Sequence, residues 1–182
     1  MRAGFCVVNV NPLYTPDELS HQLKDSGAKA IFLLDNFANT LQKALPHTPE
    51  LKHIVVSKLG DLMGVKGHLV NFALKYVKKM IPEWKIDSAI SFKRLIADGR
   101  HLQMIPVALT HDDLAFLQYT GGTTGPSKGA VLTHRNLIAN ILQNDAWASY
   151  ALKENRPQNE QIITVCALPL YHILALNGCL LM

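Results

Sequence analysis

Residues 119–129 read YTGGTTGPSKG, and this stretch decides the chemistry that we expect of the whole chain. It holds four glycines, three threonines and one lysine in eleven positions. Apolar runs lead into it at 114–119 and out of it at 130–132, so we expect a loop at the end of a strand. Glycines let backbone N–H groups approach an anion closely, threonine hydroxyls add donors, and Lys128 adds a positive charge. The composition therefore predicts a phosphate-binding loop.

Two other interpretations of this stretch are a P-loop and a hairpin loop that binds no ligand. The P-loop of nucleotide hydrolases, G-x-x-x-x-G-K-[ST], does not fit, because Ser127 precedes Lys128 and Gly129 follows it. No hydroxyl after the lysine is available for magnesium. The second alternative is a Gly/Thr-rich hairpin loop that binds no ligand, but such loops seldom combine this glycine content with a lysine at the exit.

The longer stretch at 119–136, YTGGTTGPSKGAVLTHRN, resembles the phosphate-binding signature of the adenylate-forming enzymes, which include acyl-CoA synthetases, luciferases and peptide-synthetase adenylation domains. Gly122 stands where many members have Ser, and Pro126 lies one place earlier than the usual proline. The glycine variant followed by LTHRN is most similar to the long-chain fatty-acid–CoA ligases. Residues 7–32, VVNVNPLYTPDELSHQLKDSGAKAIF, and 167–176, ALPLYHILAL, resemble the same subfamily in the same order.

The resemblance implies that ATP activates a long-chain fatty acid to an acyl-adenylate and then to acyl-CoA, with release of pyrophosphate and AMP. ATP, Mg²⁺ and coenzyme A would take part. Lys128 would be catalytic, because it would neutralise the departing pyrophosphate. The residues that we expect to bind the β- and γ-phosphates are Thr120, Gly121, Gly122, Thr123, Thr124, Gly125, Lys128 and Gly129. We find no convincing magnesium carboxylate in the chain, and the resemblance places it in a later motif.

A second candidate site is the pair Tyr171 and His172, which follows Pro169 at the end of an apolar run. In the family that it resembles, the aromatic–His pair lines the place where the acyl carboxylate meets the α-phosphate. We therefore expect both residues to contact substrate and His172 to be catalytic. The alternative is a histidine that only caps the turn from strand to helix.

Composition and cysteine content limit the class of protein. The chain has 182 residues, 48% hydrophobic and 18% charged, enough to fill a globular core, and its net charge of +4 is modest, so we expect no nucleic-acid partner. Cys6, Cys166 and Cys179 lie far apart in apolar contexts, which is typical of reduced core residues in a cytoplasmic protein. Neither a leader pattern nor an apolar run of about 18 residues is present.

The expected fold class is α/β, with doubly wound, largely parallel sheets and flanking helices. Strands are expected at 4–10, 28–34 and 53–57. Between the first two, Thr15 and Glu18 form a capping-box pattern around Pro16, which predicts a helix start. Strand, helix and strand in this order predict a parallel pair between 4–10 and 28–34.

The second half of the chain is expected to carry the chemistry. We expect a strand at 116–119, a helix from 134 to about 148, a buried strand at 162–167 and an apolar helix after His172. We therefore divide 1–182, an incomplete N-terminal AMP-binding domain by the resemblance, into three portions. These are a scaffold at 1–58, a basic helical and irregular connection at 59–109, and the phosphate-loop and substrate-motif portion at 110–182.

Residues 65–81 are expected to form a basic amphipathic helix, because apolar residues recur at helical spacing with Lys75, Lys78 and Lys79 on the opposite arc. A broad apolar face flanked by lysines is typical of a helix that lies on an anionic membrane. The alternative is that this face packs on the domain. We thus expect a cytoplasmic protein with peripheral contact on the inner face of a membrane as one of two alternatives.

The function therefore has three alternatives at this point. The first is a long-chain fatty-acid–CoA ligase, whose full-length form could be a homo-oligomer. The second is an adenylate-forming ligase of a different carboxylate, and the third is a non-catalytic nucleotide-binding module. Residues 1–182 by themselves are expected to be inactive, because the resemblance places further catalytic motifs outside them.

Overall fold

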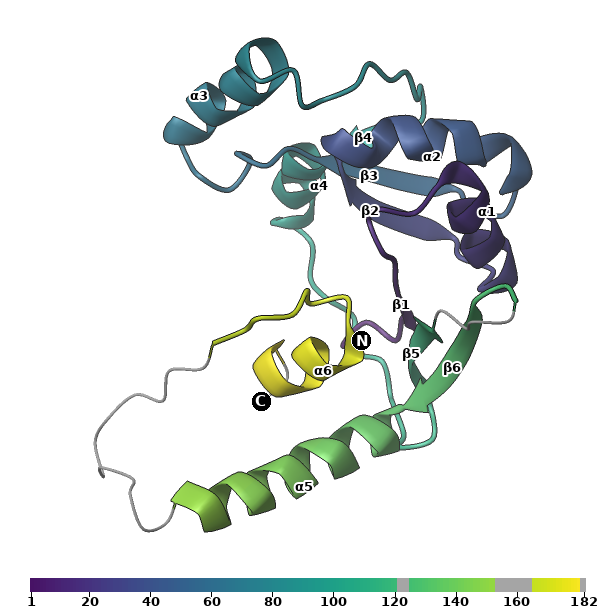
Figure 1. Cartoon of the computed structure of the whole chain (residues 1–182), viewed down its shortest axis with the longest axis vertical. Coiled ribbons are helices and arrows are strands. Elements are labelled where there is room, and N and C mark those ends of the chain that lie inside the picture. Colours follow the sequence, from purple (N-terminus) through teal and green to yellow (C-terminus); the bar gives the residue numbers. More distant parts are fainter. Residues whose placement is uncertain (121–124, 153–164, 181–182) are drawn as a thin grey trace. The chain divides into compact units, whose positions relative to one another are not determined.

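The computed structural model describes residues 1–120, 125–152 and 165–180 and divides the chain into two compact units. One unit is Pro12–Met104, and the other joins Met1–Asn11 to Ile105–Met182 (Figure 1). Each unit contains a three-stranded sheet, and three of the four strand pairs are parallel. This mixed architecture of largely parallel sheets with flanking helices confirms the expected α/β fold class.

The Pro12–Met104 unit is built on a fully parallel sheet in the order β2 (Ala30–Leu34), β3 (His53–Ser57) and β4 (Ala89–Ser91). Helices α1 (Pro16–Asp25) and α2 (Ala38–Ala44) pack against each other, and a 3₁₀ turn (Asp35–Phe37) precedes α2. A second 3₁₀ turn (Leu45–His47) follows α2, and α4 (Phe92–Gly99) packs on β3. The most deeply buried large apolar side chains of this unit are Leu19, Leu23, Leu41, Ile54 and Val55.

The start of α1 follows the sequence pattern. The Thr15 backbone N–H donates to the Glu18 carboxylate at 2.8 Å, and the Glu18 N–H donates to the Thr15 hydroxyl at 3.3 Å, with Pro16 in the first helical position. These bonds satisfy backbone donors that have no partner inside a helix. The Thr15 backbone N–H and the Thr15 hydroxyl both donate to the Glu18 carboxylate, and these two bonds, led by the one from the backbone, lower the pKa of Glu18. The predicted capping box is confirmed.

The predicted pairing of strand 4–10 with strand 28–34 is wrong. The first strand, β1 (Val7–Asn9), instead pairs in parallel with β5 (Leu114–Thr120), which is more than 100 residues away in sequence. The parallel partner of β2 is β3, and α2 forms the crossover between them. A buried apolar run shows that a strand is present, but local sequence does not select its partner.

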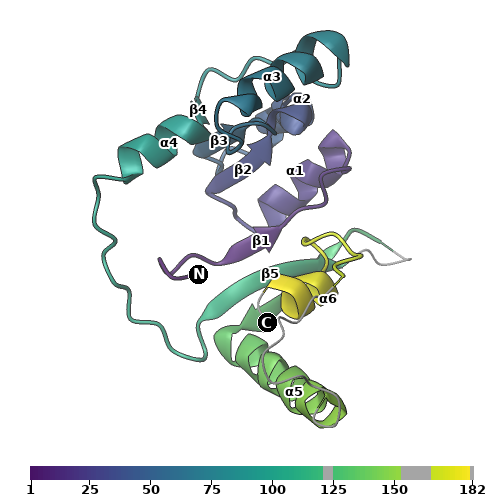
Figure 2. The same cartoon turned by 90° about the vertical axis from the view of Figure 1, so that its left-hand side faces the viewer.

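The other unit has the strand order β1–β5–β6, with β6 (Lys128–Thr133) antiparallel to β5. Helix α5 (His134–Leu152) follows β6, and α6 (Ile173–Ala175) continues into a π-helix (Leu176–Leu180). Phe116 and Ala115 meet Leu137 of α5 and Leu176 of the π-helix in one buried cluster, and Ile173 of α6 packs against it (Figure 2).

Two expectations for this unit need correction. The predicted strand at 162–167 lies partly outside the described residues, and its described end, 165–167, has no strand structure and leaves Val165 85% exposed. No described strand pairs with 165–167, so nothing there orders an extended backbone into a sheet. Cys6 and Cys166 are exposed and not core residues, because neither side chain lies on a covered face.

The basic segment forms α3 (Lys66–Phe72), which continues as a π-helix (Ala73–Val77). The predicted helix therefore ends four residues earlier than expected, because Lys79 has a left-handed φ of 48° ahead of Pro82. Proline also disfavours helical backbone at the residue before it. None of the helices in the described parts of the chain is long and apolar enough to cross a bilayer.

Small residues hold α3 against the rest of its unit. A Cβ on Gly67 would lie 1.8 Å from the Gly60 carbonyl oxygen, and the Gly60 N–H donates to the Asn71 side chain at 2.8 Å. This close approach turns the Gly67–Asn71 side of the helix inward. The large apolar side chains therefore face outward, and the exposed ones are Val65, Leu69, Phe72, Tyr76 and Val77. Within the described residues, this apolar face does not pack on its own unit.

We expect the substitution Gly67→Ala to destabilise the Pro12–Met104 unit, because its methyl group would clash with the Gly60 carbonyl. The free energy of unfolding should fall by roughly 1–3 kcal/mol, as in other overpacked sites. Urea denaturation followed by tryptophan fluorescence measures this change. The control is Gly99→Ala in α4, where nothing lies within 4 Å of the added carbon. Equal unfolding midpoints for the two variants would contradict the close approach.

Candidate functional site

The predicted phosphate loop connects the two strands of a hairpin. Thr120, at the end of β5, pairs directly with Lys128, at the start of β6, so the two ends of the loop are held side by side. Lys128 is exposed on the hairpin, and Gly125 is exposed in the loop. The other predicted phosphate ligands, Gly121, Gly122, Thr123 and Thr124, lie outside the described residues.

This hairpin differs from a P-loop in a second respect, which concerns the source of positive potential. A P-loop leads directly into a helix, whose N-terminus contributes to phosphate binding. Here the loop leads into β6, and α5 begins only at His134. Positive potential at the loop must therefore come from backbone N–H groups, hydroxyls and Lys128.

Gly129 is required by packing next to the loop. It pairs with Tyr119 across the hairpin, and a Cβ at Gly129 would lie 3.0 Å from the Tyr119 ring. Tyr119 is only 8% exposed, so its ring has little space to move. The absence of a side chain at Gly129 thus leaves space for the Tyr119 ring over β6, at the strand pair next to Thr120–Lys128.

The residues after the hairpin form a helix start. Thr133 and Asn136 bond reciprocally, with the Thr133 N–H donating to Asn136 Oδ1 at 2.9 Å and the Asn136 N–H donating to the Thr133 hydroxyl at 3.3 Å. Arg135 donates to Asp112 at 2.9 Å, and its backbone N–H donates to the His111 carbonyl at 2.8 Å. The start of α5 is therefore tied to the turn that precedes β5.

The turn before β5 also changes the pKa of one carboxyl group in this region, that of Asp113. Asp113 accepts hydrogen bonds from the Thr110 backbone N–H and from the Thr110 hydroxyl at 2.9 Å. These bonds, led by the one from the backbone, lower the pKa of Asp113. The His134 N–H donates to the Asp113 carbonyl at 3.1 Å, which joins the turn to α5 again. His134 and Arg135 thus both have a role at the start of α5.

The histidine of the second motif caps α6. His172 Nδ1 accepts a hydrogen bond from the Leu174 N–H at 3.3 Å, and the His172 N–H donates to the Pro169 carbonyl at 2.9 Å. The capping role that the sequence suggested as an alternative is therefore observed. Because Nδ1 is an acceptor, the neutral ring carries its proton on Nε2. His172 is exposed and Tyr171 is half-buried.

The loop strand and the Tyr171–His172 turn are joined by Gln118. Its side-chain Nε2 donates to the Tyr171 carbonyl at 3.1 Å, from a position on β5 two residues before Thr120. Sequence reasoning did not single out Gln118. The available signal was a polar residue inside an otherwise apolar strand, where an amide must find partners.

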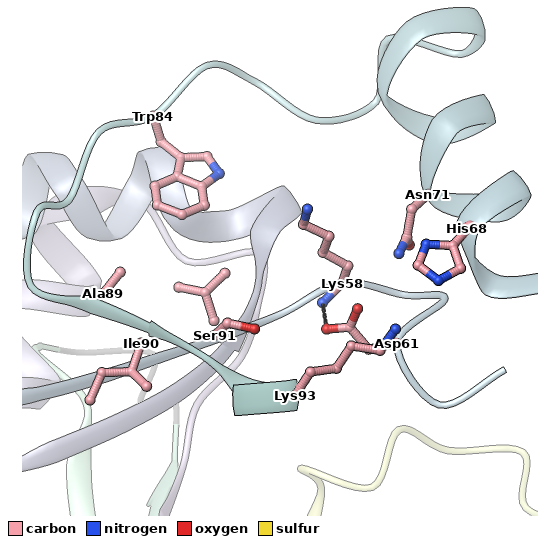
Figure 3. Close-up of a pocket in the computed structure, with 10 residues that line it drawn as sticks. Lys58, Asp61, His68, Asn71, Trp84, Ala89, Ile90, Ser91 and Lys93 are labelled. Atoms are coloured by element: carbon pink, nitrogen blue, oxygen red, sulfur yellow. Dashed lines mark hydrogen bonds between the residues drawn. The ribbon is translucent and has the colours of Figure 1, made fainter. Parts of the chain in front are cut away.

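A separate pocket lies in the Pro12–Met104 unit, with a volume of about 310 Å³ (Figure 3). Lys58 follows β3, Ser91 ends β4 and Lys93 is in the first turn of α4, so the pocket opens at the carboxyl ends of two parallel strands. Asp61 accepts from the Lys58 N–H at 2.8 Å, and Trp84 forms another wall. None of the residues that the sequence singled out for chemistry lines this pocket. Strand ends in a parallel sheet are the signal that could have found it.

At the carboxyl end of β2, next to these strands, Asp35 is 3% exposed, and its Oδ1 has no hydrogen-bond partner among the described residues. Burial raises the pKa of Asp35, and the charge of Lys58 partly opposes this effect. Among the described residues, no group of three His, Cys, Asp or Glu side chains could hold a metal ion.

Comparison with known proteins assigns the family. The sequence model of the AMP-binding enzymes matches residues 1–182. The chain belongs to the AMP-binding enzyme family. It is 51% identical over its whole length to a long-chain-fatty-acid–CoA ligase of Escherichia coli O157:H7, of which it covers 32%. It is 32% identical over 98% of its length to 4-coumarate–CoA ligase 3 of Arabidopsis thaliana, of which it covers 26%.

A solved structure supports the fold of this AMP-binding chain. The A domain of the carboxylic acid reductase from Segniliparus rugosus, solved with AMP and a carboxylic acid, aligns with 96% of this chain and 27% of its own, with a TM-score of 0.63 and 20% identity. At this identity the likeness concerns the fold alone. The chain spans about a third of the length of the curated ligases that it matches.

We expect Gly129→Ala to loosen the hairpin of this AMP-binding chain, because the added methyl would meet the buried Tyr119 ring. Amide hydrogen exchange in β5 and β6 should become roughly tenfold faster, as expected for local destabilisation of about 1.4 kcal/mol. Gly125→Ala is the control, since no atom of the described residues lies within 4 Å of its added carbon. Equal exchange in both variants would show that Gly129 has no packing role.

Proposed function

We propose that this chain provides the phosphate-binding and acyl-activating part of a long-chain fatty-acid–CoA ligase. The single observation that favours this function is the 51% identity, over the whole chain, to a ligase of that name. The hairpin and the Tyr171–His172 turn lie in one compact unit, as a shared site requires.

The proposed reaction has two steps. A carboxylate oxygen of the fatty acid attacks the α-phosphorus of ATP, the bond to the β-phosphate oxygen breaks, and pyrophosphate leaves with the electron pair. The thiolate of coenzyme A then attacks the acyl carbon, and AMP leaves. Phosphoryl chemistry of this kind depends mainly on positioning and charge neutralisation.

Each described residue of the site has a role in this scheme. Thr120, Gly125 and Lys128 would bind the β- and γ-phosphates together with Gly121, Gly122, Thr123 and Thr124, and Lys128 would neutralise the pyrophosphate as it leaves. Gly129 would support the loop through Tyr119. His172 would donate from Nε2 to the acyl carboxylate or the α-phosphate, because Nδ1 is occupied by the helix cap. Tyr171 would form the adjacent wall.

Magnesium would be held by ATP rather than by the residues described here. The described donors at the loop are backbone amides, a hydroxyl and an ammonium group, which suit an anion. Mg²⁺ prefers oxygen ligands and commonly binds through substrate phosphates, where it neutralises charge. We therefore assign ATP and coenzyme A as substrates and Mg²⁺ as a partner of the phosphates.

We expect Lys128→Ala to slow adenylation. Activity would be measured in a full-length graft, in which residues 1–182 replace the matching segment of the Escherichia coli O157:H7 ligase. Loss of a charged contact made mainly in the transition state costs roughly 2–4 kcal/mol, or tens- to several-hundred-fold in rate. Acyl-adenylate formation would be followed by quenched-flow sampling, with the exposed Lys52→Ala as control. Parent-like rates for Lys128→Ala would remove the lysine from the mechanism.

We also propose that the exposed face of α3 and its π-helical extension contacts an anionic membrane. Leu69, Phe72 and Val77 are 74%, 59% and 69% exposed. The Phe72 and Tyr76 rings lie 5.0 Å apart between centroids at a tilt of 41°, and the Lys75 ammonium lies 5.4 Å from the Tyr76 centroid. Aromatic and aliphatic side chains next to lysines suit the interface between headgroups and acyl chains. Long-chain fatty acids partition into membranes, so a ligase that lies on the inner face would meet its substrate there.

Replacing Lys75, Lys78 and Lys79 together by Gln tests the membrane proposal. The full-length graft carrying the triple change should sediment less with anionic vesicles at low salt, since each lysine contributes about 1 kcal/mol near anionic lipid. Adenylation of a short, soluble acid should be unchanged, because no membrane is needed for it. The matched control replaces the exposed lysines Lys24, Lys43 and Lys52 by Gln. Equal vesicle binding by parent and triple variant would contradict a membrane role.

A further inference from the structure

The side chain of Gln118 is buried and bonded at both ends. It is 9% exposed on β5, its Oε1 accepts from Asn9 Nδ2 at 3.2 Å, and its Nε2 donates to the Tyr171 carbonyl at 3.1 Å. These partners are 109 and 53 residues away in sequence. An unpaired buried amide is unfavourable, so this side chain has a single well-satisfied orientation.

Asn9 fixes the other end of this bridge. It lies on β1 directly beside Gln118, because the parallel register pairs Asn9 with Gln118. The Gln118 amide therefore reaches Tyr171 from a position defined by the sheet. The Asn9 amide, the Gln118 amide and the Tyr171 carbonyl are thus hydrogen-bonded in series, from β1 through β5 to the Tyr171–His172 turn.

The bond to Tyr171 acts on the peptide unit that carries His172. This unit uses both of its polar groups, because its carbonyl accepts from Gln118 and its N–H donates to the Pro169 carbonyl at 2.9 Å. The orientation of this peptide plane sets the direction of the His172 Cα–Cβ bond. On the other side, the Leu176 N–H donates to the His172 carbonyl at 2.9 Å, and Leu174 fixes the ring through Nδ1.

We propose that Gln118 is a positioning residue, which holds the Tyr171–His172 peptide so that His172 Nε2 faces the substrate. This inference rests on the proposed function for the role of His172. Gln118 acts through His172 and touches no reacting atom. An apolar residue would fill the same space on β5, but it would not fix the rotation of the peptide unit.

The first test asks whether Gln118 holds the turn, and it uses the 182-residue chain. Gln118→Met keeps the length of the side chain and removes both hydrogen bonds. The His172 and Leu176 amides should then exchange with solvent faster, while the Leu117 and Val131 amides of the hairpin exchange as in the parent. Unchanged exchange at His172 would overturn the inference. Gln143→Met, at an exposed position on α5, is the matched control.

The second test asks whether the effect on rate passes through His172, and it uses the full-length graft. Gln118→Met should lower kcat for acyl-adenylate formation on the order of 10–100-fold, because small misplacements of catalytic groups have effects of this size. The KM for ATP should not change. In the His172→Ala background, Gln118→Met should cause no further loss. The positioning role would be overturned if the losses in kcat multiplied in the double variant. A parent-like kcat in Gln118→Met alone would overturn it as well.

A variant with a titratable side chain distinguishes a loss of positioning from a simple folding defect. In Gln118→Glu, a protonated carboxyl group can donate to the Tyr171 carbonyl and accept from Asn9, but a carboxylate cannot donate. The kcat of this variant relative to the parent should therefore rise as the pH falls from 8 to 6. A pH-independent ratio would count against the inference. If the graft forms no acyl-adenylate at all, the proposed function fails, and the exchange measurement still decides whether Gln118 holds the turn.

Discussion

The pairing of β5 with a strand on each side is the constraint on which the candidate site depends. β5 is the middle strand of its sheet, so β1 fixes it in parallel register and β6 fixes it in antiparallel register. The antiparallel pair Thr120–Lys128 holds the two ends of the loop together and places an ammonium group at its exit. Because the loop leads into β6 and α5 begins only at His134, the proposed affinity for phosphate must come from amides, hydroxyls and this lysine.

The same strand also carries the connection to the Tyr171–His172 turn, the proposed acyl side of the site. Gln118 is two residues before the loop and bonds the carbonyl that precedes His172. His172 uses Nδ1 to cap a helix, which leaves Nε2 as the proton-bearing atom. The capping role and the proposed chemical role are therefore compatible in one side chain, because the cap leaves the proton on Nε2, as the proposed role requires.

Local sequence signals predicted the local structure well. Thr15, Pro16 and Glu18 predicted the start of α1, and the apolar run at 53–57 predicted β3, because caps and strands follow from neighbouring residues. Long-range choices were not predictable. The partner of β1, the bond from Gln118 to Tyr171 and the exposed face of α3 depend on residues far away in sequence or on the contact of Gly60 with Gly67. The pocket beside Lys58 depends on where two parallel strands, β3 and β4, end.

The central claim is that the hairpin and the Tyr171–His172 turn form one adenylating site for fatty acids. Its most direct test is the exchange of labelled pyrophosphate into ATP by the full-length graft, measured without coenzyme A. The account predicts exchange that depends on a long-chain fatty acid and that 4-coumarate does not support. ATP binding with no fatty-acid-dependent exchange, in a graft that is folded, would contradict the account and favour a non-catalytic nucleotide-binding module.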